Sequence, residues 1–396
     1  MVFKPQIIFK NYSFILGIYI LLSVIAGTQS VLLGKMQENK GKHEFLKYNN
    51  YIIFKQSYPH LLQGKDLYKA YPENYEDLYK YSPTFALAFG AFAVLPDAIG
   101  LSLWNLLNAM ILFFSFIYLP KVDMKKKIIM LMVIATELMT SLQNSQANGL
   151  VAGLIIFSFG LLERKHYILA SFCIISVLYI KLFGIVMAVL FLFYPKKWKL
   201  AVYSLAWFLL LFAAPLLVNS FSTLQFHYLK WFELLQSDYT ASYGLSVAGW
   251  IHAWFSHDVN KFILVISGFL LLMLPFLRFR QYKNFCFRMY ALASVLIWVV
   301  IFNHKAESPT FIIAMSGVAI WTLSFNPGRW KIVLLGAAVL LTSLTPTDIF
   351  PVGFRDGFLV PYAIKVVPCI VIWTLILFEM MFGKNLSSPD VHLETD

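Results

Sequence analysis

Apolar residues along the chain gather into runs that are separated by short polar connectors. The runs cover residues 12–33, 83–95, 101–119, 128–142, 147–162, 168–181, 182–194, 200–218, 262–277, 289–303, 309–324, 331–345 and 365–382. A helix needs about 20 apolar residues to cross a bilayer, so the shorter runs must use their flanks, tilt or fail to cross. The pattern predicts an all-α polytopic membrane protein that forms a single transmembrane domain over residues 1–396.

Basic residues in the connectors predict the orientation of the chain. Lys and Arg occur before the first run and in connectors 120–127, 163–166, 195–199, 278–288 and 326–331, and a tail follows Lys384. Such segments stay on the cytoplasmic side. The outer connectors are then 34–100, 143–147, the region near 181, 219–261, 303–308 and 346–364.

This alternation requires that the run 83–95, which starts at Pro83 and ends before Pro96, does not cross the membrane. We expect it to form a re-entrant or interfacial helix of the first outer loop. About 12 crossings then remain. Both termini are expected in the cytoplasm, and the protein in the cell membrane.

Composition excludes a water-soluble enzyme. Hydrophobic residues make up 59% of the chain and charged residues 13%, whereas about 25% of an average soluble chain is charged. The net charge of +12 fits basic cytoplasmic loops better than a nucleic-acid partner, which is not expected. Cys173, Cys286 and Cys369 lie far apart and form neither a disulfide framework nor a metal-binding pair.

Two outer connectors, 34–100 and 219–261, are long and rich in aromatic residues, which suit the headgroup region. We expect interfacial helices in both. Their aromatic residues either form a belt with no further role or roof a lipid-facing cavity. No internal repeat is evident, which disfavours inverted-repeat transporters.

Polar residues at the outer ends of the runs are candidates for chemistry, because burying them costs free energy. The amides of Gln146 and Asn148 suit sugar hydroxyls, or they satisfy helix ends. Lys181, alone in apolar sequence, either reaches the headgroups or pairs with an anion such as phosphate.

The turn 303–309 is the densest polar connector. Its His304, Lys305 and Glu307 have the chemistry to bind phosphate and to move a proton. Acids of the first outer loop, Asp66 among them, are either general bases or parts of a solvated surface.

Two further features involve charged or titratable residues. His252 and the pair His257-Asp258 do not share a helix face, so no metal site is expected there. Glu137 lies inside an apolar run and requires a partner that the sequence does not identify.

Several of these features follow one another in an order typical of a known family. They are Phe54, Leu61-Leu62, Gly64, Tyr68, Tyr81-Ser82-Pro83, Leu103 to Leu106, Ser145 to Asn148, Ala170 to Lys181, and Lys196 to Lys199. This order resembles the integral-membrane glycosyltransferase family 87, within the GT-C superfamily of enzymes that use polyprenyl-phosphate sugars. The resemblance is continuous over about residues 45–205.

One position departs from the family pattern. Counting back from Gly64 and Tyr68, the family's loop aspartate, which is its proposed general base, falls on Asn50. An amide does not accept a proton at neutral pH. Either another acid such as Glu44, Asp66 or Glu307 takes this role, or this branch works differently, or the chain does not catalyse.

The resemblance implies a GT-C-like hexosyltransferase at the outer face of the membrane. It would move a hexose, with mannose as one candidate, from a polyprenyl phosphate to a lipid-linked or glycan acceptor. The expected site residues are Lys181, Lys305, Lys80 and His304 for the phosphate, Gln146, Asn148, Tyr68 and Tyr81 for the sugar, and Asn50, Asp66, Glu307 and His304 for catalysis.

Beyond the two substrates, the expected partners are membrane lipids, with no separate cofactor and no metal. A nucleotide-binding motif is not visible. The alternatives are a transporter or lipid flippase, or a non-catalytic relative of such enzymes.

Overall fold

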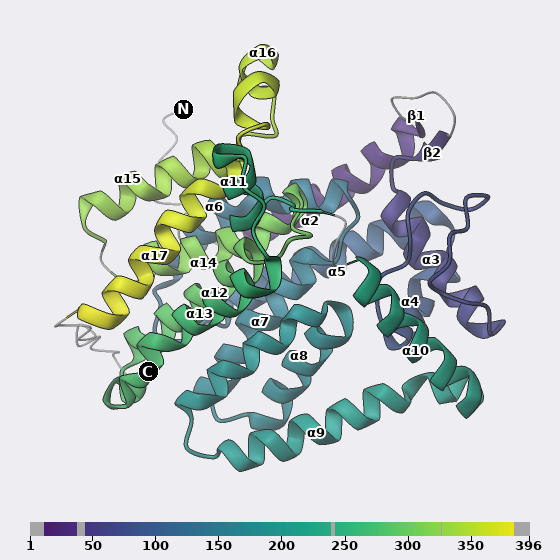
Figure 1. Ribbon diagram of the computed structural model, residues 1–396, viewed down its shortest axis with the longest axis horizontal. Coiled ribbons are helices and arrows are strands. Elements are labelled where there is room, and N and C mark those ends of the chain that lie inside the picture. Colours follow the sequence, from purple (N-terminus) through teal and green to yellow (C-terminus); the bar gives the residue numbers. More distant parts are fainter. Residues whose placement is uncertain (1–11, 38–43, 239–241, 326, 384–396) are drawn as a thin grey trace.

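The computed structural model describes residues 12–37, 44–238, 242–325 and 327–383. Within these residues the chain is helical apart from one short antiparallel hairpin (Figure 1). Its strands, β1 (Lys35–Gln37) and β2 (Glu44–Leu46), pair Lys35 with Leu46. Both chain ends, and with them the expectation that they are cytoplasmic, lie outside the described residues.

The helices follow the apolar runs closely. They are α2 (Tyr12–Leu33), α3 (Asn49–Leu62), α4 (Pro83–Ala93), α5 (Asp97–Ile117), α6 (Met124–Gln143), α7 (Asn148–Glu163), α8 (Tyr167–Ile180), α9 (Lys197–Ala213), α10 (Phe221–Asp238), α11 (Val247–Phe255), α12 (Lys261–Met273), α13 (Phe285–Ile301), α14 (Phe311–Leu323), α15 (Arg329–Ala338), α16 (Val352–Phe354) and α17 (Val367–Phe382).

Shorter 3₁₀ and π segments join or extend these helices. The 3₁₀ segments are η1 (Leu182–Phe193), η2 (Ala214–Leu217), η3 (Leu274–Leu277), η4 (Phe279–Lys283), η5 (Ser308–Thr310) and η8 (Ile364–Val366). The π segments are η6 (Val339–Ser343) and η7 (Arg355–Leu359).

Four helical stretches of the described chain are long and apolar enough to cross a membrane: Tyr12–Leu33, Asp97–Ile117, Lys197–Leu217 and Ile364–Phe382. Further apolar helices, such as Asn148–Glu163 and Phe285–Ile301, are shorter. The prediction of a helical membrane protein is therefore confirmed. The count of 12 crossings stays a prediction, because several helices reach a full span only with their flanking turns.

The core is built around α13 and α14, which lie against each other. Every residue of α14 is buried, and so is every residue of α13 except Arg288. Small residues permit close approach: a Cβ on Gly317 would lie 2.6 Å from the Ala293 carbonyl oxygen. Such contacts are typical of helices that associate within a membrane.

A lipid-facing periphery surrounds this core. In α9 only Leu200 is buried, and large side chains such as Leu205, Leu209 and Leu210 are exposed. The apolar face of α12 is also exposed, including Phe262 and Leu270. A continuous exposed apolar surface on this scale requires a membrane around it.

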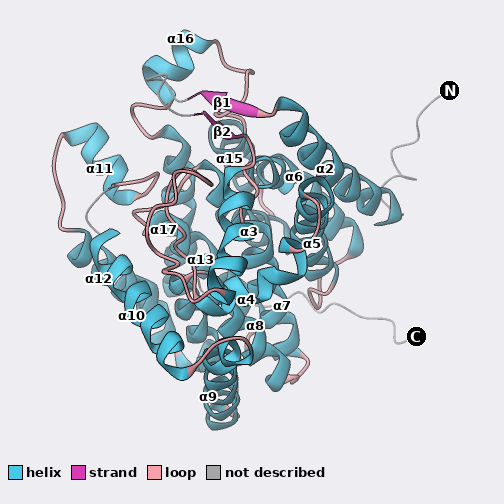
Figure 2. Cartoon of the chain, turned by 90° about the vertical axis from the view of Figure 1, so that its right-hand side faces the viewer, coloured by secondary structure: helices cyan, strands magenta, loops and turns pink. Residues whose placement is uncertain are grey.

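The two long loops that we expect outside, 34–100 and 219–261, contact each other at one end of the molecule. Figure 1 shows α3, α4, the hairpin and α10 together on the right, and Figure 2 looks onto this face. The Trp231 indole N–H of α10 donates to the Lys80 carbonyl oxygen at 3.2 Å. The Asn219 amide donates to the Leu61 carbonyl oxygen at 3.0 Å. The loops therefore form one layer over this end of the bundle.

The first loop contains α4, which the charge pattern predicts not to cross the membrane. Ser82 caps α4 by accepting from the Phe85 N–H, and Pro83 opens it. The helix has 11 residues, about 16 Å at 1.5 Å per residue, which is close to half of the hydrocarbon thickness. Helix α4 is shorter than the run 83–95, and a re-entrant or interfacial position for it stays a prediction.

Candidate active site

Lys181 lies where α8 ends, and it faces the start of α7. Its backbone is extended, with φ −142° and ψ 119°, and this ends the helix after Ile180. The ammonium Nζ donates to Oδ1 of Asn148 at 2.5 Å. Because α7 begins at Asn148, the contact joins the adjacent ends of two neighbouring helices.

Asn148 also bonds to the amide of Gln146, two residues earlier in the chain. Its Nδ2 donates to Oε1 of Gln146 at 2.6 Å and to the Pro309 carbonyl oxygen at 3.0 Å. Nε2 of Gln146 donates in turn to Oε2 of Glu307 at 2.9 Å. Lys181, Asn148, Gln146 and Glu307 therefore form one hydrogen-bonded chain, the polar relay, with a cation at one end and a carboxylate at the other.

The relay brings together three regions that the sequence singled out separately: the amide turn, the lone lysine and the turn 303–309. Asn148 is fully buried and Gln146 is 8% exposed. Lys181 is half-buried, and Glu307 is exposed. The relay therefore connects a half-buried cation, through two buried amides, to an exposed carboxylate.

The turn that carries the amides has a specific backbone requirement. After α6 ends at Gln143, Ser145 adopts a left-handed conformation with φ 54°. Its carbonyl oxygen accepts from the Trp104 indole N–H at 2.9 Å. This fixed reversal directs Gln146 and Asn148 toward the turn around Glu307.

Electrostatics distinguishes the two ends of the relay. Burial lowers the pKa of the Lys181 ammonium to about 8, and the Glu307 carboxylate opposes that shift. Burial also raises the pKa of Tyr81, with the charge of Glu307 as a second cause. Tyr81 packs against Phe54 and Phe85, so the aromatic loop ahead of α4 lies within electrostatic range of Glu307.

A family model decides what kind of protein carries this relay. The model described as "Glycosyltransferase family 87" matches residues 79–302, more than half of the chain. The chain belongs to glycosyltransferase family 87. No curated protein matches the sequence.

Membership of family 87 makes this chain a membrane glycosyltransferase and confirms the resemblance seen in the sequence. It also favours the enzyme over a transporter, a flippase or a non-catalytic relative. The matched residues include Lys181, Asn148 and Gln146. Glu307 lies five residues beyond the end of the match.

Asn50, which the resemblance aligns with the family's aspartate, lies outside the matched residues and attaches the first long loop to α6. Asn50 lies in the first turn of α3, and its Nδ2 donates to the Asn144 carbonyl oxygen at 2.9 Å. Neighbouring Asn49 donates to the Glu76 carbonyl oxygen and accepts from the Glu76 N–H. These amides attach the first outer loop to the end of α6 and to itself.

Other residues proposed from the first outer loop hold that loop together. The Asp66 carboxylate accepts from the Tyr68 N–H at 2.9 Å. The buried Tyr68 donates its hydroxyl to the Tyr81 carbonyl oxygen at 3.1 Å. Lys80 and Asp77 form an ion pair at 3.1 Å. The site roles of these residues stay predictions. The alternative acid Glu44 falls in β2.

His304 and Lys305 occupy the turn that precedes Glu307. The Lys305 N–H donates to Oδ1 of Asn303 at 3.0 Å, which tightens the turn. Both residues are half-buried. Their positions beside Glu307 agree with the predicted cluster, whereas phosphate binding by either stays a prediction.

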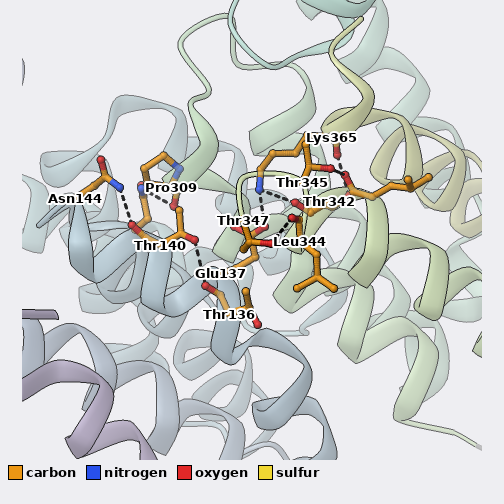
Figure 3. Close-up of polar contacts among 12 residues, drawn as sticks. Thr136, Glu137, Thr140, Asn144, Pro309, Thr342, Leu344, Thr345, Thr347 and Lys365 are labelled. Atoms are coloured by element: carbon orange, nitrogen blue, oxygen red, sulfur yellow. Dashed lines mark hydrogen bonds and ion pairs between the residues drawn. The ribbon is translucent and has the colours of Figure 1, made fainter. Parts of the chain in front are cut away.

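The partner of Glu137 is Lys365, which the sequence analysis missed. Their Nζ–Oε1 distance is 2.6 Å, and the two side chains are 0% and 4% exposed (Figure 3). Lys365 also donates to the Thr342 carbonyl oxygen at 2.7 Å. The available signal was that Lys365 opens the last apolar run, because a buried carboxylate requires a cation.

The described residues contain no group of three His, Cys, Asp or Glu side chains arranged for a metal ion. His252 and Asp258 nevertheless lie together, with Nδ1 and Oδ1 at 2.8 Å. The helix-face argument did not anticipate this pair, because the chain reverses between the two residues.

Proposed function

We propose that this glycosyltransferase moves a hexose from a polyprenyl-phosphate donor to a lipid-linked or glycan acceptor at the outer face of the cell membrane. The observation that carries the proposal is the polar relay, which joins Lys181 to Glu307 through two amides. Mannose is one candidate for the hexose.

Lys181 is the residue best suited to the donor phosphate. A sugar phosphate on an isoprenoid tail presents its charge at the membrane boundary, beside apolar helices. Lys181 lies between α8 and the apolar segment η1, and a half-buried cation interacts more strongly with an anion than a solvated one. As the bond between the anomeric carbon and the phosphate oxygen breaks, the ammonium would stabilise the developing charge.

The amides of Gln146 and Asn148 are suited to holding the transferred sugar. Each amide offers a carbonyl acceptor and two N–H donors. The relay uses part of this capacity, and it fixes which end of each amide faces the cation. Oriented amides beside the phosphate site would hold sugar hydroxyls in a defined position.

Glu307 supports the role of proton acceptor better than the residue at the family's aspartate position. Asn50 is an amide, and it donates to a backbone carbonyl. Glu307 is an exposed carboxylate at the open end of the relay. In one displacement, the acceptor oxygen would attack the anomeric carbon, its proton would pass to Glu307, and polyprenyl phosphate would leave. The configuration at that carbon inverts.

The test is a transfer assay with the full chain in proteoliposomes. Radiolabelled mannosyl and glucosyl polyprenyl phosphates are offered as donors, and the matching nucleotide sugars serve as controls. We expect one lipid donor to be consumed and the nucleotide sugars to remain intact. The Lys181→Ala variant should lose the activity, and Lys65→Ala, in an exposed lysine of the first loop, should retain it. Consumption of a nucleotide sugar alone would contradict the proposed donor.

A further inference from the structure

A cluster of two exposed side chains and one half-buried side chain lies in the second long loop, outside the polar relay. Helix α11 ends at Ser256, whose left-handed backbone has φ 50°. This reversal brings Asp258 back to His252, where Nδ1 and Oδ1 lie 2.8 Å apart. The two side chains are 49% and 70% exposed. The geometry leaves the other ring nitrogen, Nε2, away from this hydrogen bond.

Tyr243 completes this cluster, which we call the outer clasp (Tyr243, His252 and Asp258). Its ring stacks on His252 with centroids 4.7 Å apart and an interplanar angle of 14°. The Tyr243 hydroxyl and the His252 ring both interact with the Asp258 carboxylate and hold its pKa below its usual range. In the tautomer whose Nδ1–H donates to Asp258, the Nε2 atom of His252 is a hydrogen-bond acceptor.

The outer clasp is joined directly to the turn that carries Glu307. The Leu245 N–H donates to the Ala306 carbonyl oxygen at 2.7 Å. Gly244, with φ 54°, lies so close to this turn that a Cβ would be 2.5 Å from the His304 carbonyl oxygen. Ala306 immediately precedes Glu307, so a backbone hydrogen bond connects the segment next to Tyr243 with the turn that carries Glu307.

The chemistry of the clasp fits a hydroxylated ligand better than a phosphate. Asp258 places a carboxylate in the cluster, and the Lys261 ammonium, 4.6 Å from the Tyr243 ring centroid, offsets its charge, so the cluster suits an uncharged ligand. The Nε2 acceptor and the carboxylate both accept hydrogen bonds from hydroxyl groups. The His252 ring, which is 49% exposed and stacked on Tyr243, adds an apolar surface for the C–H face of a sugar.

We propose that the outer clasp binds sugar hydroxyls of the acceptor and presents the acceptor to Glu307. The inference rests on the proposed function, because it assigns the second substrate of the same reaction. His252 and Asp258 are binding residues in this account, and Glu307 remains the group that receives the proton.

The experiment measures where the transferred hexose goes. The full chain in proteoliposomes receives the radiolabelled polyprenyl-phosphate hexose that it consumes, together with lipid extracted from membranes of the producing organism as the acceptor source. The label is divided into lipid- or glycan-linked product and free hexose released by water. His252→Gln and Asp258→Asn should each lower the ratio of product to free hexose about tenfold, as the loss of a hydrogen bond to a charged group does.

The neighbouring His257→Gln is the matched control, and it should keep the wild-type ratio. Should a clasp variant fail to fold, Tyr243→Phe retains the stacked ring, removes the hydroxyl bonded to Asp258, and should lower the ratio in the same direction. Wild-type ratios in the folded clasp variants would overturn this inference alone. A wild-type protein that consumes no polyprenyl-phosphate hexose would overturn the proposed function and this inference with it.

Discussion

Asn148 controls the arrangement of the relay, because one fully buried amide contacts the cation, the second amide and a backbone carbonyl. Its Oδ1 accepts from Lys181, which leaves Nδ2 to donate to Gln146 and to Pro309. The three hydrogen bonds that link the relay residues therefore all run in one direction, from Lys181 to Glu307. The residue types were visible in the sequence, but their order of contact was not, since it depends on how α7, α8 and η5 meet.

Glu307→Gln separates the proton-accepting role of this residue from its hydrogen bonding. An amide at this position still accepts from Gln146 but does not take up a proton. We expect turnover to fall by roughly 10²–10⁴-fold, the usual contribution of a general base. The donor KM should stay close to the wild-type value. Turnover near the wild-type value, measured in the proteoliposome assay, would exclude Glu307 as the base.

The lowered pKa of Lys181 predicts a pH dependence of donor binding. The ammonium is charged below its pKa of about 8 and loses its charge as the pH rises through that value. Attraction for the donor phosphate should therefore be present at pH 7 and weaken above pH 8, which raises the donor KM. In Lys181→Arg the guanidinium stays protonated, so any activity it retains should show no rise in KM between pH 7 and pH 9. Identical KM profiles for the two proteins would contradict this role.

The helices match the predicted apolar runs where hydrophobicity alone determines their position. Helix α2 occupies the predicted run 12–33 without change, and most other runs gained or lost a few residues at their ends. The run 182–194 differs, because it forms the long 3₁₀ segment η1 instead of an α-helix. Its residues are as apolar as those of its neighbours, so composition gave no signal. A Cβ on Gly184 would lie 2.3 Å from the Val177 side chain, and this close approach to α8 depends on tertiary structure.

Gly244→Ala tests whether the second outer loop must contact the turn around Glu307. A side chain there meets both a left-handed backbone and the His304 carbonyl oxygen at 2.5 Å. We expect a destabilisation of roughly 1–3 kcal/mol and a loss of transfer activity. The control is Gly336→Ala in α15, where a Cβ meets nothing within 4 Å. Equal midpoints and equal activities for the two variants would show that the contact is unimportant.

The molecule as a whole is a helical bundle whose outer loops form a layer over the relay. Hydropathy and charge predicted the bundle and the presence of outer helices. They could not predict that the two loops contact each other through Trp231 and Asn219, or that Glu137 pairs with Lys365. These contacts join residues that are more than 100 positions apart in the chain, and each partner alone resembles an ordinary loop or helix-end residue.

Cysteine labelling tests the orientation of this bundle. The basic connector before α13 is expected inside and the turn after it outside, because positive charge stays on the cytoplasmic side. Lys305→Cys should react with a membrane-impermeant thiol reagent in intact cells, and Lys283→Cys only after permeabilisation. The three native cysteines are buried, which keeps the background low. The opposite pattern would reverse the topology.

The Glu137–Lys365 pair should be a large single contribution to the stability of the bundle. Removing one partner leaves a buried charge without compensation, at a cost of about 3–5 kcal/mol. Glu137→Gln and Lys365→Met should each lower the unfolding midpoint in detergent, and the double variant should be more stable than either single variant. In the exposed Lys230–Glu233 pair, Glu233→Gln should leave the midpoint unchanged. Additive losses in the double variant would show that the two charges are not coupled.

The most direct test of the account is a structure of the full chain bound to polyprenyl phosphate, the product that leaves. The account predicts the phosphate in contact with Nζ of Lys181, beside Asn148, with Glu307 open on the side from which the acceptor arrives. A phosphate bound elsewhere, with Lys181 still donating to Asn148 and remote from the ligand, would contradict it.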